Sequence, residues 1–113
     1  MQTDLTYMKS MFGDNKKVLK EMIDIFAEQV VEISEQMDHA FENKDYVTLG
    51  KLAHKAKASV SMMGMKNMAA MLKELELNAS EGKYTETFEA TVTQFKNSCS
   101  IAVEELYNFL EKE

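Results

Sequence analysis

The chain has 113 residues, about the length of one domain, so we expect residues 1–113 to form a single domain. Apolar residues make up 45% of it and charged residues 28%, as in soluble globular proteins, while a net charge of −6 disfavours binding to nucleic acid or anionic lipid. There is no proline, and the four glycines are scattered, which argues against a turn-rich sandwich or barrel and against a phosphate-binding glycine loop.

The predicted elements are all helices. The segment from Leu5 to Phe12 predicts a short N-terminal helix, and four longer apolar series follow it. Within each series the apolar residues alternate between spacings of four and three, which draws one stripe along a helix and does not fit a strand. The four stripes are Leu19, Ile23, Phe26, Val30, Ile33, Met37 and Ala40; Leu49, Ala53, Ala56, Val60 and Met63; Met65, Met68, Leu72, Leu75 and Ala79; and Phe88, Val92, Phe95, Cys99, Ala102, Leu106 and Phe109.

The breaks between the stripes carry residues that are typical of helix ends. The candidate caps and breaks are Asp14 or Asn15, the segment 43–45, Gly64, Gly82 and Thr85. Because the connections are short, neighbouring helices should run antiparallel. The sequence therefore predicts an all-α fold, an antiparallel up-down-up-down four-helix bundle with a short extra helix at the N-terminus.

Several classes of site are excluded or disfavoured. Cys99 is the only cysteine and is expected in the core, so neither an internal disulfide nor a thiolate metal site can form. His39 and His54 are not spaced as metal ligands, and no metal site is predicted. We find no signal peptide and no stretch long enough to cross a membrane, so the expected location is the cytoplasm.

The helix expected after residue 45 presents an unusual outer face. With about 100° per residue, His54 projects away from the apolar stripe that begins at Leu49. The residues one and two turns away on the same face are small or uncharged, namely Val47, Gly50, Ala58 and Ser61. Solvated helix faces are usually rich in charged side chains. This face is therefore a candidate surface for close approach by a partner protein, with Met62 at its rim.

Lysines surround this face. Residues 44–66 contain five lysines and one acidic residue, a local net charge of +4 on an acidic chain. Lys51 flanks the face, and Lys57 follows His54 by three positions, close enough to reach an anion on the imidazole. A local basic zone of this kind favours an acidic partner or an anion.

Phosphoryl transfer through histidine is the chemistry that fits these residues. A neutral imidazole nitrogen is a good nucleophile, and its phosphoryl adduct is labile enough to be passed on. Such transfer depends mainly on positioning and on charge neutralisation, which His54 and Lys57 could provide. No acid–base pair of carboxylates stands out, and Glu28, Glu32 and Glu35 are expected on a solvated face.

The segment from Ala53 to Gly64, AHKAKASVSMMG, resembles the signature of histidine-containing phosphotransfer (HPt) domains, approximately A-H-x-L-K-G-S-S-x-x-x-G. The matching positions are His54, Lys57, Ser59 and Gly64, and Gly64 is expected to separate two helices. The resemblance extends over nearly the whole chain, because the family is a four-helix bundle with its histidine on the second bundle helix.

The resemblance implies a function. His54 would accept a phosphoryl group through Nε2, and Lys57 would contact that group. The partners would be response-regulator receiver domains and a hybrid sensor histidine kinase, with Mg²⁺ supplied by the receiver and no cofactor on this chain. The protein would be a phosphocarrier in a two-component phosphorelay, without ATP-dependent kinase activity, and a monomer is the simplest expectation.

Three positions depart from the family pattern. Ala56 stands where the family usually has leucine, Ala58 where it has glycine and Val60 where it has a second serine. These changes affect the details of docking rather than the phosphoacceptor. Two alternatives stay open from the sequence: a non-catalytic helical adaptor that docks a partner through the same face, and a phosphoacceptor domain excised from a larger kinase.

Overall fold

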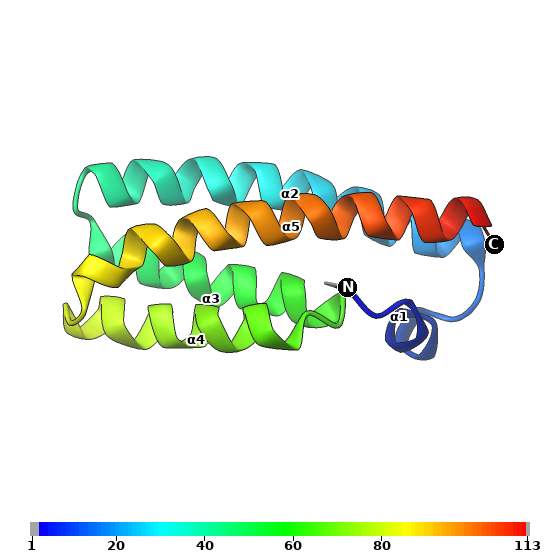
Figure 1. Ribbon diagram of the computed structural model, residues 1–113, viewed down its shortest axis with the longest axis horizontal. Coiled ribbons are helices and arrows are strands. Elements are labelled where there is room, and N and C mark those ends of the chain that lie inside the picture. The colour runs from blue at the N-terminus through cyan, green and yellow to red at the C-terminus, as the bar shows by residue number, and fades with distance from the viewer. Residues whose placement is uncertain (1–2, 113) are drawn as a thin grey trace.

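The computed structural model describes residues 3–112; residues 1, 2 and 113 of the expected domain lie outside that range. The described elements are α1 (Leu5–Phe12), α2 (Lys16–Glu42), α3 (Tyr46–Met62), α4 (Lys66–Glu81), the 3-10 turn η1 (Thr85–Thr87) and α5 (Phe88–Lys112). Every regular element in residues 3–112 is helical, which confirms the all-α fold. The four long helices lie side by side, and each runs back along the one before it (Figure 1). Among these helices, none combines the length and apolar character that crossing a bilayer requires.

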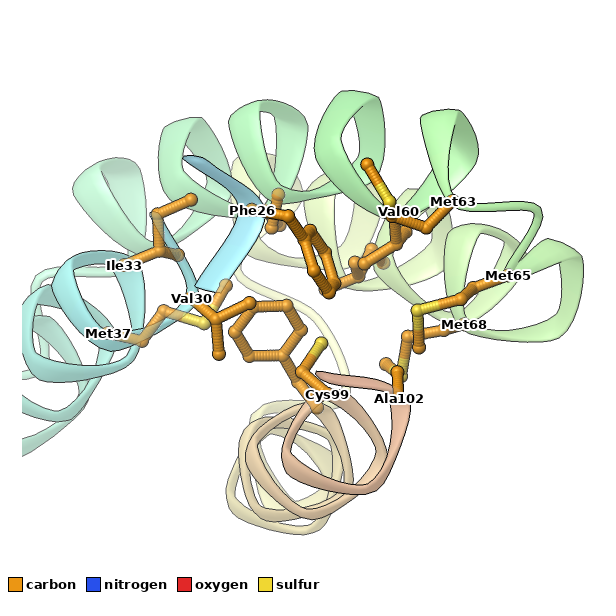
Figure 2. Close-up of a cluster of buried hydrophobic side chains, with 14 of the residues drawn as sticks. Phe26, Val30, Ile33, Met37, Val60, Met63, Met65, Met68, Cys99 and Ala102 are labelled. Atoms are coloured by element: carbon orange, nitrogen blue, oxygen red, sulfur yellow. The ribbon is translucent and has the colours of Figure 1, made fainter. Parts of the chain in front are cut away.

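The four apolar stripes form the core of this bundle. Of the residues assigned to them, all are buried except Phe109, which is half-buried. Phe109 and Leu110 lie on opposite flanks of the α5 stripe, about 100° apart, and the core takes Leu110 instead. Side chains from α2, α3, α4 and α5 meet in one interior, with Met63, Met65 and Met68 together at one side (Figure 2). Burial raises the pKa of the Cys99 thiol to about 12, as expected for a core cysteine.

The helix ends follow the sequence signals with one exception. Asn15 is the N-cap of α2, where its side-chain oxygen accepts hydrogen bonds from the backbone N–H groups of Lys17 and Val18. Gly82 ends α4 in the left-handed conformation, with φ of 66°. Thr85 was expected to cap α5, but it begins η1, which leads directly into α5 at Phe88. The preceding Tyr84 takes a left-handed conformation, which turns the chain into this extra 3-10 turn.

The short N-terminal helix is positioned by the connection between α3 and α4. The long helices α2 and α5 extend beyond α3 and α4, and α1 lies at the end of the bundle where they do so (Figure 1). Met8 of α1 is fully buried in the common core. Just before α1, the backbone N–H of Asp4 donates to the carbonyl of Met63 at 3.2 Å. The segment that precedes α1 is therefore joined to the end of α3.

Gly64 makes this contact possible, and its substitution tests the arrangement. Gly64 has φ of +75°, and a Cβ atom there would lie 2.8 Å from the Cβ of Asp4. We expect Gly64→Ala to lower the free energy of unfolding by about 1–3 kcal/mol, measured by urea denaturation. Gly82→Ala is the matched control, because Gly82 is also left-handed but has no neighbour within 4 Å of the added atom. Equal losses in the two variants would show that the contact with Asp4 contributes nothing.

Candidate functional site

The helix that carries His54 is fixed firmly at its start. Asp45 is the N-cap of α3, and its carboxylate accepts hydrogen bonds from the backbone N–H of Thr48 at 3.1 Å and from its hydroxyl at 2.6 Å. These bonds lower the pKa of Asp45. The buried side of α3 faces the core through the predicted stripe, so the opposite side is presented outward. The side chain of His54 is 67% exposed, as its helical position predicted.

The packing of α3 against α4 brings a carboxylate to this histidine. Gly50 of α3 is buried, and a Cβ atom there would lie 3.4 Å from the Cβ of Ala79 and 3.5 Å from the carbonyl oxygen of Glu76. Because neither Gly50 nor Ala79 has a long side chain, the two helix backbones approach closely at this point. Glu76, on the side of α4 that faces α3, therefore reaches His54, one turn after Gly50.

Glu76 contacts both residues that the sequence singled out. One of its carboxylate oxygens, Oε2, lies 2.9 Å from Nδ1 of His54, and the other, Oε1, lies 3.3 Å from Nζ of Lys57. Burial by itself raises the pKa of Glu76, but the hydrogen bonds with Lys57 and His54 outweigh this effect and the pKa lies below its usual value. The carboxylate of Glu76 is thus ionised near neutral pH and can only accept hydrogen bonds.

This arrangement fixes the proton of the neutral imidazole. Since an ionised carboxylate accepts the hydrogen bond, Nδ1 of His54 must carry the hydrogen, and Nε2 is left with its free electron pair. Nδ1 and Nε2 lie on different edges of the ring, so Glu76 occupies one edge and leaves the other available to a reagent. In the neutral ring, the nitrogen with the free electron pair is therefore Nε2.

Ser59 of the motif bonds α3 to α2, whereas Ser61 bonds within α3. The hydroxyl of Ser59 donates to Oε1 of Gln29 on α2 at 2.8 Å, a half-buried bond between residues 30 positions apart. The hydroxyl of Ser61 donates to the backbone carbonyl of Lys57 at 2.7 Å. Ala56 and Val60, which depart from the family pattern, are both fully buried, so the changes at these two positions face the core.

The residues predicted to form a docking face do not all lie at the same depth. Val47, Lys51, Ala58, Ser61 and Met62 are exposed, whereas Gly50 is buried against α4. A shallow groove of about 500 Å³ runs between α3 and α4; it is lined by Val47, Gly50, Lys51, His54, Glu76 and Ser80. Its floor is low because Gly50 has no side chain. The outer side of α3 therefore carries mostly short side chains, and a groove runs along it beside the imidazole of His54.

Residues expected to have no part in the site lie away from it. His39 is exposed on α2, and the three acids Glu28, Glu32 and Glu35 are exposed on the same helix, as predicted. Sequence reasoning missed Glu76. Its contact with His54 depends on the register between two helices, which the spacing of residues within one helix does not reveal. One feature of the sequence could have pointed to Glu76. It directly follows the core residue Leu75, so it lies at the edge of the apolar stripe of α4 and not on the opposite side of the helix.

Comparison with known proteins identifies the family of the chain. A search of curated proteins and a search of solved structures found no significant match. A family model described as the Hpt domain matches residues 21–110, which include most of α2, all of α3 and α4, and nearly all of α5. The matched region includes the exposed histidine, the neighbouring lysine and the helices that position them. The chain belongs to the Hpt domain family, whose general role is histidine phosphotransfer in phosphorelays.

Proposed function

We propose that this protein is a phosphorelay intermediate that accepts a phosphoryl group on Nε2 of His54 from the aspartyl phosphate of one receiver domain and passes it to the aspartate of another. The observation that carries the proposal is the hydrogen bond of Nδ1 of His54 to Glu76, which leaves Nε2 as an exposed nucleophile. The exposed face around Val47 and Ala58 supports docking of a receiver domain. Mg²⁺ would be held by the receiver and not by this chain.

The transfer needs no proton to move. The electron pair of Nε2 attacks phosphorus, the bond from phosphorus to the aspartate oxygen breaks, and its electron pair stays on that oxygen. The ring becomes an imidazolium that still has its hydrogen on Nδ1, and the adjacent Glu76 carboxylate stabilises the new positive charge. In the onward step an aspartate oxygen of the second receiver attacks phosphorus, the bond from phosphorus to Nε2 breaks, and its electron pair returns to Nε2, which leaves the imidazole neutral.

The positive charge of Lys57 assists the same transfer. Its ammonium is on the same helix as His54, three residues later, and its long side chain can follow a phosphoryl group on Nε2. A cation beside the transferring group neutralises part of its charge. Lys51 and Lys55 are exposed on the same helix and add to the positive potential that favours an acidic receiver site.

Transfer of label tests the proposal directly. The purified protein is incubated with a receiver domain phosphorylated with radioactive phosphate. Label should appear on this chain in a linkage that is stable to alkali and labile to acid, and it should pass to a second receiver. Long-range nitrogen NMR of the imidazole then shows which ring nitrogen carries the group. Stable binding of the receiver without any transfer would instead favour a non-catalytic adaptor.

Glu76 has a separate expected effect on rate. We expect Glu76→Met to slow the initial rate of phosphoryl acceptance about tenfold or more, because the ring loses both the acceptor that fixes its hydrogen on Nδ1 and the negative charge beside the imidazolium. Methionine keeps an unbranched side chain of similar length. Glu74→Met is the matched control, since Glu74 is exposed on the same helix and lines a different cavity. An unchanged rate in Glu76→Met would contradict the role given to this carboxylate.

A further inference from the structure

In the unphosphorylated protein, Lys57 is bound to a carboxylate that also contacts His54. Its ammonium contacts Oε1 of Glu76, whose other oxygen contacts Nδ1 of His54. The side chains of Lys57 and Glu76 are each 29% exposed, so the pair is partly shielded from water. In this state the ammonium of Lys57 is paired with the carboxylate that bonds Nδ1 of His54.

The phosphorylated state would place a second anion within reach of the same lysine. A phosphoryl group on Nε2 carries about two negative charges and three strong acceptor oxygens. Lysine is a compact charge on a flexible stem, so its ammonium can change partners without a change in the helix. The single positive charge of Lys57 would then be shared between two anions, so a stronger bond to the phosphoryl oxygens weakens its bond to the carboxylate.

We infer that Lys57 is a cation with two positions: it rests on Glu76 in the free protein and moves to the phosphoryl oxygens when His54 is phosphorylated. This inference rests on the proposed function and adds a property to it. When Lys57 moves, its ion pair with Glu76 is lost. This loss offsets part of the stabilisation that Lys57 gives to phosphohistidine. Through its pairing with Lys57, Glu76 thereby weakens retention of the phosphoryl group, in opposition to the direct stabilisation that its carboxylate gives to the imidazolium.

A double-mutant cycle separates this competition from the direct effects of Glu76 on the ring. The equilibrium partition of phosphoryl between a receiver domain and this protein is measured for the native chain, Lys57→Met, Glu76→Met and the double variant. We expect the loss of Lys57 to shift the partition away from His54 at least about threefold more when residue 76 is methionine than when it is glutamate. In the methionine background, Lys57 gives up no resting partner when it binds the phosphoryl group.

Lys51 provides the matched control. It precedes His54 by three residues, as Lys57 follows it by three, and it lines the groove on the same helix. Lys51→Met should shift the partition by the same factor in both backgrounds. An equal effect of Lys57→Met in the two backgrounds would overturn the inference. Absence of any label on the native chain would overturn the proposed function and this inference together, whereas label with an equal Lys57 effect would overturn the inference alone.

A second measurement uses the native chain without substitutions. Phosphoramidate phosphorylates exposed histidines without a protein donor, so NMR spectra can be recorded before and after treatment. The side-chain carboxyl carbon of Glu76 and the ammonium nitrogen of Lys57 should both shift on phosphorylation, because their mutual contact is broken. If His54 is phosphorylated and the Lys57 ammonium nitrogen keeps its shift, Lys57 does not change partner and the inference is wrong.

Discussion

Replacing His54 by glutamine is expected to abolish phosphoryl acceptance, with labelling from a phosphorylated receiver falling to background. Glutamine has no nitrogen with a free electron pair that can attack phosphorus, although it is similar in size and favours helix formation. The side chain at this position is 67% exposed, so the substitution removes no core contact. Circular dichroism should show unchanged helical content, and the loss of label would then report chemistry alone.

His39→Gln is the control for this experiment. His39 is the other histidine of the chain, is exposed on α2 and does not line the groove beside His54. The His39→Gln protein should accept label at the native rate. Label that persists in His54→Gln and disappears in His39→Gln would move the phosphoacceptor to α2 and refute the site described above.

The largest expected effect on stability comes from the core of α2. Phe26 is 1% exposed and lies among residues from the other long helices (Figure 2). We expect Phe26→Ala to lower the free energy of unfolding by about 3–5 kcal/mol, because it removes a large buried ring and leaves a cavity. Denaturation in guanidinium chloride, followed by circular dichroism, measures the change.

The adjacent residue provides an internal comparison. Ile25 is 48% exposed, one position before Phe26 on the same helix. Ile25→Ala should cost no more than about 1 kcal/mol, since most of the removed surface already contacts water. Similar losses at the two positions would mean that the apolar stripe of α2 does not face the core in the way the helix periodicity predicts.

The sequence predicted the helices and the core well because both depend on local spacing. The alternation of four and three placed Leu19, Val60 and Leu106 in the interior, and each is nearly or fully buried. The pattern failed near the end of α5, where Phe109 and Leu110 flank the stripe and only packing decides between them. It also failed at Thr85, because the left-handed conformation of Tyr84 is set by the loop as a whole.

The candidate site was predicted in part for a similar reason. His54 and Lys57 lie on one helix, and their common side of that helix follows from their spacing. Glu76 lies on another helix, and it meets them only because α3 and α4 pack closely at Gly50. Helix spacing places the proposed nucleophile, but the carboxylate that bonds its Nδ1 emerges only from the three-dimensional structure.

The close packing of α3 and α4 has a consequence for protein engineering. His54, Lys57 and Glu76 all lie within residues 46–81, two consecutive helices joined by a short turn. The helices α2 and α5 contribute mainly an apolar support for this helical hairpin. The candidate site is therefore a contiguous module that could be grafted onto an unrelated four-helix scaffold, provided that the graft preserves the small residues where the two helices touch.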